Sequence, residues 1–163
     1  MGMEQLSLVI SLFQQLCVYL VIAWLLSKTP LFMPLTQVPL SLPHKLVCYL
    51  IFSTFCILGT YFGLRIENSI ANTRAIGAVL GGIVGGPAVG LLVGLTGGLH
   101  RYSLGGSTAA SCGIATVLAG ILAGLVRFRC PFTHMNWKIA AAIALVAEVL
   151  QKSLTLLLAK PFE

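Results

Sequence analysis

The sequence predicts an all-α integral membrane protein, and three observations carry that prediction. Of 163 residues, 58% are hydrophobic and only 9% are charged. The mean hydropathy is +0.98, and apolar runs of about 20 residues, the length that crosses a bilayer, recur along the chain. A soluble protein of this length cannot cover so much apolar surface. We therefore expect one membrane domain, residues 1–163, with about six membrane-crossing helices.

Composition also excludes several classes of function. The net charge of +6 comes from scattered Lys and Arg that flank the apolar runs, which indicates membrane topology and not binding to nucleic acid. No Walker-type phosphate loop and no catalytic set of side chains is present, so we expect no cofactor. The five cysteines have no CxxC spacing, so we expect neither a metal site nor a disulfide framework; they stand at positions 17, 48, 56, 112 and 130.

Two long apolar runs predict the first two crossings, residues 6–26 and 46–64. About 20 residues, each rising by about 1.5 Å along a helix, match a hydrocarbon core of about 30 Å. The four prolines between them forbid a regular helix, so residues 27–45 are expected to form a loop. Glu4, with no Lys or Arg before the first run, favours a retained span over a cleaved signal peptide.

The third apolar segment is expected to fold back on itself. One continuous helix from Arg74 to Arg101 would be about 40 Å long and would put the two arginines at opposite membrane faces. The Gly-Gly-Pro at 85–87, near the midpoint, is a strong break signal. We therefore predict two short helices, 74–85 and 87–101, with both arginines on one side. Glycines at four-residue spacing permit the close packing that this requires; they are Gly77, Gly81 and Gly85 in one register and Gly82, Gly86, Gly90, Gly94 and Gly98 in another.

Two more helices are expected, over 107–128 and 138–158, with Ser107 or Thr108 capping the first of them. The positive-inside rule favours an N-terminus outside the cell. In that topology the basic residues inside are Lys28, Lys45, Arg127, Arg129 and Lys138, and those outside are Arg65, Arg74, Arg101 and Lys160.

Arg74 and Arg101 are the leading functional candidates, because an ionised side chain within a bilayer is costly and marks a site by default. The planar guanidinium matches a carboxylate with two parallel hydrogen bonds. Backbone N–H groups at Gly106, Ser107 and Thr108, where a helix begins, would also face a small anion. The alternative is that both arginines only extend to the lipid headgroups.

Four further side chains are candidates, and three of them have two interpretations each. Cys112 and Thr116, one and two turns into the next helix, would line the floor of the pocket, with Cys112 either a reactive thiol or a small packing residue. His100 either tunes binding with pH or is an ordinary interfacial histidine. Glu148 either neutralises Lys152, four residues further on, or pairs with one of the arginines until a ligand releases it.

Several stretches carry a family resemblance: NTRAIGAVLGGIVGGPAVG, LTGGLHRYSLGG and TAASCGIAT, with QQLCVYLVIAWLLSKTPLF near the start and AKPFE at the end. They resemble the LYT-class membrane receptor domains of bacterial sensor histidine kinases of the LytS and YehU (BtsS) type, over almost the whole chain. The hairpin is more distantly similar to the substrate-binding subunits of energy-coupling-factor vitamin transporters.

The resemblance implies a homodimeric sensor of a two-component system in the bacterial inner membrane, with a periplasm-facing pocket for extracellular pyruvate. It implies signalling to a cytoplasmic kinase and from there to a response regulator. Its ligand-binding positions map onto Arg74, Arg101 and Cys112. The serine of the pyruvate-sensing members is Ala115 here, and Ser111 or Thr116 would have to substitute for it. No kinase segment follows Glu163, so the parent protein, and not this chain, is expected to be the enzyme.

Two other functions stay open at this point. The chain is either a small membrane transporter or transporter subunit for an organic anion, or a structural membrane protein whose glycines only mediate oligomerisation. Uptake into liposomes separates a transporter from a sensor, because a sensor binds its ligand without moving it across the membrane. Thermal stabilisation by a ligand counts against a purely structural role.

Overall fold

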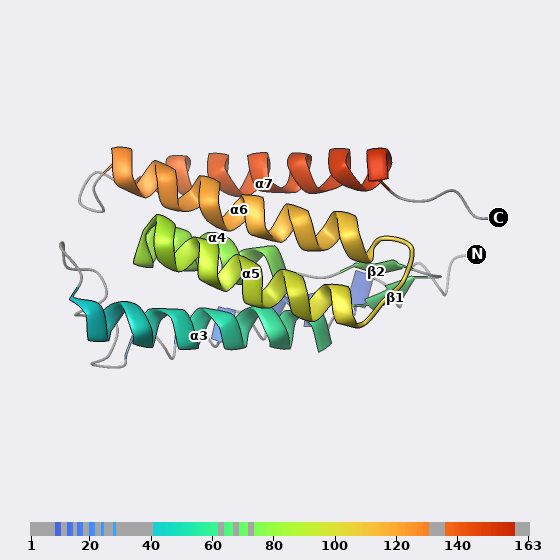
Figure 1. The fold of residues 1–163 in the computed structure, drawn as a ribbon, viewed down its shortest axis with the longest axis horizontal. Helices are drawn as coiled ribbons and strands as arrows, with labels where there is room; N and C mark the ends of the chain where they lie inside the picture. Colours follow the sequence, from blue (N-terminus) through green and yellow to red (C-terminus); the bar gives the residue numbers. More distant parts are fainter. Residues whose placement is uncertain are drawn as a thin grey trace.

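Five helices and one two-stranded antiparallel ladder make up the described part of the chain (Figure 1). The computed structural model describes residues 41–61, 64–66, 69–71, 74–130 and 136–158, with isolated positions between 9 and 28. The expected first span, 6–26, therefore lies largely outside the described residues. The elements are α3 (Leu42–Tyr61), β1 (Leu64–Ile66), β2 (Ser69–Ala71), α4 (Arg74–Gly85), α5 (Pro87–Ser103), α6 (Ala109–Arg129) and α7 (Trp137–Leu158).

The observed boundaries agree closely with the expected ones, with two corrections. The predicted end of the loop, at residue 45, is wrong, because α3 begins at Leu42 and contains Pro43. A proline is tolerated in the first helical turn, where its missing N–H would have had no partner. The expected end of the second crossing, at residue 64, is also wrong, because α3 ends at Tyr61 and Leu64 begins β1, which pairs with β2.

The chain reverses direction between α4 and α5, as the Gly-Gly-Pro signal predicts. Gly86 has φ 84°, a left-handed conformation that side chains with a Cβ rarely adopt. Pro87 follows as the first residue of α5, where its fixed φ suits the start of a helix. The two helices run antiparallel, so the start of α4 and the end of α5 meet at one end of the bundle (Figure 1).

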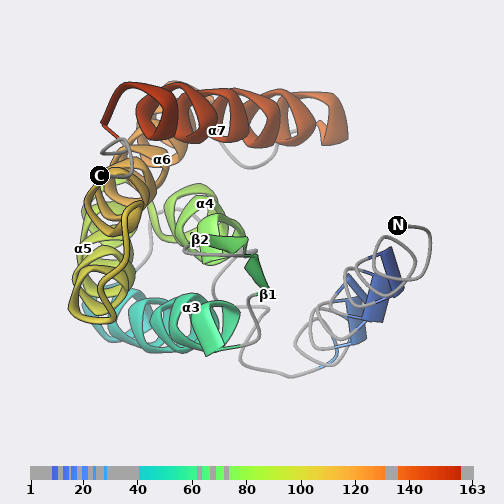
Figure 2. The ribbon, with the colours of Figure 1, turned by 90° about the vertical axis from the view of Figure 1, so that its right-hand side faces the viewer.

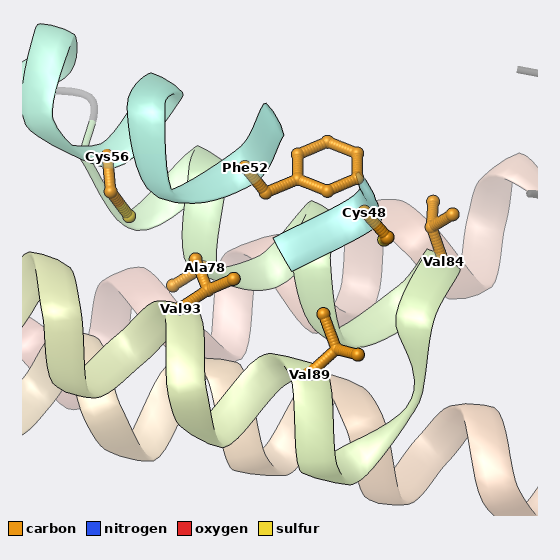
Figure 3. Close-up of a cluster of buried hydrophobic side chains, with 7 residues drawn as sticks. All are labelled: Cys48, Phe52, Cys56, Ala78, Val84, Val89 and Val93. Carbon is orange, nitrogen blue, oxygen red and sulfur yellow. The ribbon is translucent and has the colours of Figure 1, made fainter. Parts of the chain in front are cut away.

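The short helix α4 is the most enclosed element of the bundle. All of its 12 residues except Ile76 and Leu80 are buried. Viewed end-on, α4 lies inside, with α3, α5, α6 and α7 around it (Figure 2). On one side its side chains meet a cluster from α3 and α5 (Figure 3); the cluster contains Cys48, Phe52, Cys56, Ala78, Val84, Val89 and Val93.

Glycines let the helix backbones touch where α4, α5 and α6 cross. A Cβ added to Gly90 would collide with the carbonyl oxygen of Gly120, and one added to Gly120 would collide with that of Gly90. A Cβ on Gly82 would lie 2.5 Å from the same Gly120 oxygen, and one on Gly94 would lie 2.8 Å from the Cα of Val117. The four-residue glycine spacing thus marks the faces through which α4 and α5 pack on α6.

Three helices of the described chain are long and apolar enough to cross a membrane: α3, α6 and α7. α6 is central and α7 is peripheral, since 56% of the apolar window is buried in α6 and 17% in α7. α4, with 12 residues, is about 18 Å long and shorter than a hydrocarbon core of about 30 Å. The structure thus shows an all-helical membrane architecture, and the total of about six crossings stays a prediction.

Candidate functional site

Arg74 and Arg101 converge at one end of the bundle and are both fully buried, at 0% exposure. Arg74 is the first residue of α4 and Arg101 lies in the last turn of α5. The reversal at Gly86 therefore brings together two side chains that a continuous helix would separate. The start of α6 lies at the same end and supplies their hydroxyl neighbours (Figure 1).

Thr116 on α6 orients the guanidinium of Arg74. The Nε of Arg74 donates a hydrogen bond to the Thr116 hydroxyl at 3.0 Å. That hydroxyl in turn donates to the carbonyl oxygen of Cys112 at 2.8 Å, one turn earlier in the helix. Because its proton is directed there, a lone pair of the oxygen is left for Arg74. Cys112 and Arg101 lie close enough to Arg74 to act on its charge.

The guanidinium of Arg101 binds the loop that connects α5 to α6. One terminal nitrogen donates to the carbonyl oxygen of Gly105, and the other donates to the hydroxyl of Thr108 at 3.3 Å. Gly105 can present its carbonyl in this way because it adopts φ 70°. The Nε of Arg101 is also buried, and within the described residues it has no hydrogen-bond partner.

Thr108 occupies the capping position of α6, as expected, but its side chain does not cap the helix. Its hydroxyl accepts the hydrogen bond from Arg101 instead. Its carbonyl oxygen accepts bonds from the backbone N–H of Cys112 at 3.0 Å and from the hydroxyl of Ser111 at 3.1 Å. Ser107, the other expected cap, precedes it and is half-buried. A tertiary contact with a charged group has thus replaced a local capping bond.

Cys56 on α3 is a member of the site that the sequence analysis did not single out. Its thiol donates to the carbonyl oxygen of Arg74 at 3.2 Å. It fits between two glycines, since a Cβ on Gly77 or on Gly97 would approach atoms of Cys56 to 2.9 Å. Cys56 therefore ties α3 to the residue that carries the first guanidinium. No motif or spacing in the sequence indicates this role.

His100 and Glu148, the two secondary candidates, differ in burial. His100 is half-buried with its ring 5.4 Å from that of Tyr61, and its Nδ1 has no hydrogen-bond partner in the described part of the chain. Glu148 is exposed on α7. Both interpretations of Glu148, a pair with Lys152 and a pair with one of the arginines, stay predictions.

The cluster is closed, whereas the sequence analysis expected an open pocket between helices. Thr116, Ser111 and Cys112 are buried with the arginines, and so is Ala115. The hollows that the structure shows lie elsewhere, one between α6 and α7 and a smaller one on the outer face of α5 and α6. Hydroxyl and carbonyl groups of the protein accept hydrogen bonds from Arg74 Nε and from both terminal nitrogens of Arg101. A carboxylate that binds these nitrogens would replace those acceptors. No group of three or more metal-ligating side chains occurs in the described residues.

Comparison with known families identifies the type of domain. The family model described as 5TMR of 5TMR-LYT matches residues 29–163. The chain belongs to this family. All five described helices, from Leu42 to Leu158, fall inside the matched range. The family resemblance that the sequence carries is therefore confirmed.

Curated relatives agree with the family assignment. The chain is 57% identical to the sensor histidine kinase BtsS of Escherichia coli (strain K12), over 99% of the chain and 30% of the relative. It is 37% identical to the sensor protein LytS of Bacillus subtilis (strain 168), over 96% of the chain and 30% of the relative. It is also 30% identical to the sensor histidine kinase YpdA of Escherichia coli (strain K12), over 90% of the chain and 26% of the relative.

The chain thus spans about 30% of the length of the first curated relatives. It corresponds to the membrane sensing domain of LytS/BtsS-type sensor histidine kinases. No solved structure matches the chain, so the likeness of the hairpin to energy-coupling-factor subunits stays a prediction.

The hydrogen bond between Arg74 and Thr116 predicts a specific pair of variants. We expect Thr116→Val, which keeps the shape of the side chain and removes the acceptor, to destabilise the protein by about 1.5–3 kcal/mol, the range for a hydrogen bond to a charged group. Thr116→Ser keeps the hydroxyl, so its stability should be much closer to that of the parent chain. Thermal unfolding of the three purified proteins in the same detergent measures the difference. Equal melting temperatures for Val and Ser would show that the hydroxyl does not hold Arg74.

Proposed function

We propose that this membrane sensing domain binds a small carboxylate, with pyruvate as the preferred candidate, at the cluster of Arg74 and Arg101. Ligand binding then controls a histidine kinase region that lies outside this chain. The observation that carries the proposal is Arg101: its charge is fully buried, one of its donors has no acceptor in the described residues, and a second guanidinium lies close by.

Electrostatics favours an anion at this point. Two guanidinium groups cannot give up their protons, and in a medium of low dielectric constant they repel each other. Neither the Thr108 hydroxyl nor the Gly105 carbonyl, which accept the bonds of Arg101, carries a compensating charge. A carboxylate that replaces them would make stronger, charge-assisted hydrogen bonds. The amino-terminal end of α6, which begins beside Thr108, adds a dipole of the favourable sign.

The residues around the two arginines favour a ligand of only a few atoms. The neighbours of Arg74 on α6, Cys112 and Thr116, are small and buried. A 2-oxo acid such as pyruvate offers two carboxylate oxygens and a carbonyl oxygen as acceptors, which suits a site rich in guanidinium and hydroxyl donors. Ala115 has no donor, so in this chain Ser111 or Thr116 would have to contact the carbonyl oxygen.

We propose that the arginine cluster faces the periplasm and that the opposite end of the bundle faces the cytoplasm. The opposite end, where α3 and α7 begin and α6 ends, carries Lys45, Arg127, Arg129 and Lys138. Such a bias towards Lys and Arg is typical of the cytoplasmic side. An impermeant maleimide applied to intact cells should therefore label Ser103→Cys, and should label Asn136→Cys only after permeabilisation, with the parent chain as background. The reverse pattern would invert the topology.

Signalling would follow from the way in which the site joins separate helices. Arg74 belongs to α4, Arg101 to α5 and their hydroxyl acceptors to α6, so replacing these bonds by bonds to a ligand changes the contacts among three helices. In the proposed full-length protein, a homodimer in the inner membrane, this change reaches a kinase region and then a response regulator. A transporter, the alternative function, requires access from both ends of the bundle, and both arginines lie at one end.

Arginine variants test the binding site directly. We expect Arg74→Ala and Arg101→Ala each to remove a charge-assisted contact of about 1.5–3 kcal/mol and thereby weaken pyruvate binding by about 10–150-fold or more. Isothermal titration calorimetry on the purified chain measures the affinity. Arg74→Lys and Arg101→Lys, which keep the charge and lose the planar fork, should bind with intermediate affinity.

Lys152→Ala is the matched control, because Lys152 is a basic residue exposed on α7. It should bind pyruvate as the parent chain does. Unchanged affinity in both Arg74→Ala and Arg101→Ala, in protein that melts cooperatively, would show that pyruvate does not bind at this site. Accumulation of pyruvate inside liposomes that contain the parent chain would favour the transporter.

A further inference from the structure

A second candidate site lies at the other end of the molecule from the arginine cluster. A groove with a volume of about 810 Å³ runs between α6 and α7. Its walls are almost entirely aliphatic or aromatic, with Leu122, Leu125 and Phe128 on α6 and Ile139 and Val146 on α7. Two cationic residues complete the lining: Arg129 and Lys138.

Arg129 and Lys138 lie together at one end of this groove. Arg129 is the last residue of α6 and Lys138 is the second residue of α7, and the two helices lie side by side (Figures 1 and 2). Both side chains are exposed, and neither forms an ion pair with any residue of the described chain. The nitrogen of Lys138 lies 6.0 Å from the centre of the Trp137 ring, a residue type that favours the membrane interface.

The combination of an apolar groove and a cationic end matches the two parts of a phospholipid. Acyl chains fill a lipid-facing groove without exposing apolar surface to water. Two cations at the interface attract a phosphate, and basic pockets between transmembrane helices on the cytoplasmic side are a recurrent site for anionic headgroups. The first turn of α7 contains no acidic residue, so its amino-terminal dipole adds to the attraction.

The chain itself contains little that could neutralise this pair. Its only acidic residues are Glu4, Glu67, Glu148 and Glu163. Glu148 is ten positions from Lys138 on the same helix, a distance of about 15 Å, and the apolar run at 6–26 contains no acid. That run would therefore not supply a counter-charge to Arg129 and Lys138, and Glu148, the one acidic residue of α7, is exposed at a different level of the helix. Charge complementarity favours a negatively charged lipid.

We propose that the groove between α6 and α7 is a binding site for an anionic phospholipid, whose acyl chains lie along Leu122, Leu125 and Val146 and whose phosphate is held by Arg129 and Lys138. The site is independent of the arginine cluster and of its ligand. It gives the cytoplasmic end of the bundle a preference for negatively charged lipid over zwitterionic lipid.

Native mass spectrometry of the purified chain, with equimolar phosphatidylglycerol and phosphatidylcholine of the same acyl chains, tests the proposal. The parent chain should retain phosphatidylglycerol preferentially. Arg129→Gln and Lys138→Gln should each reduce that preference by about five-fold, the effect expected of one basic residue at an anionic surface. The double variant should show no preference, and Arg129→Lys should keep most of it.

Controls separate a specific site from general attraction. Lys152→Gln, a change of the same kind on the exposed face of α7, should leave the preference intact. Ala142→Trp, which fills the groove, should reduce retention of both lipids, and inorganic phosphate should not compete. A double variant that still prefers phosphatidylglycerol, or an equal loss in Lys152→Gln, would overturn the proposal. So would photo-crosslinks from position 125 that join two chains and capture no lipid.

Discussion

The structure depends on placing two buried guanidinium groups at the same end of a helical bundle. Arg74 and Arg101 are far apart in the sequence and are brought together because the chain turns back at Gly86. The turn makes α4 short, and a short helix can be enclosed within the bundle instead of facing lipid. Everything proposed for ligand binding follows from this arrangement, since neither arginine alone would make a two-pronged site for a carboxylate.

Close packing at glycines stabilises this arrangement in a chain with few polar side chains. Gly90 and Gly120 bring the backbones of α5 and α6 into direct contact, and Gly77 and Gly97 leave room for Cys56. In lipid, where burial of apolar surface does not drive association, such contacts and a few hydrogen bonds hold helices together. The bonds from Arg74 to Thr116 and from Arg101 to Thr108 supply that second component at the end where the site lies.

Local signals predicted the helices well, and tertiary contacts explain what the sequence analysis missed. The break at Gly86 and Pro87 could be predicted from the sequence because the backbone geometry of these residues imposes it, and α4 ends at Gly85 as predicted. Thr108 stands at the expected capping position, but its hydroxyl binds Arg101, a competitor that no local pattern reveals. The same holds for the bond from Cys56 to Arg74 and for the closed state of the cluster, which both arise from packing between helices distant in sequence.

A disulfide between α4 and α5 tests the reversal most directly. A Cβ on Gly81 would lie 3.4 Å from the Cβ of Val93, close to the spacing in disulfides of about 3.5–4.5 Å. Oxidation of the Gly81→Cys, Val93→Cys double variant should therefore give an intramolecular link between positions 81 and 93 in high yield, as judged by mass spectrometry of the digested protein. The control pair Gly81→Cys, Leu92→Cys should not crosslink, because Leu92 is exposed. In one continuous helix, positions 81 and 93 would lie about 18 Å apart, and absence of the link would contradict the account.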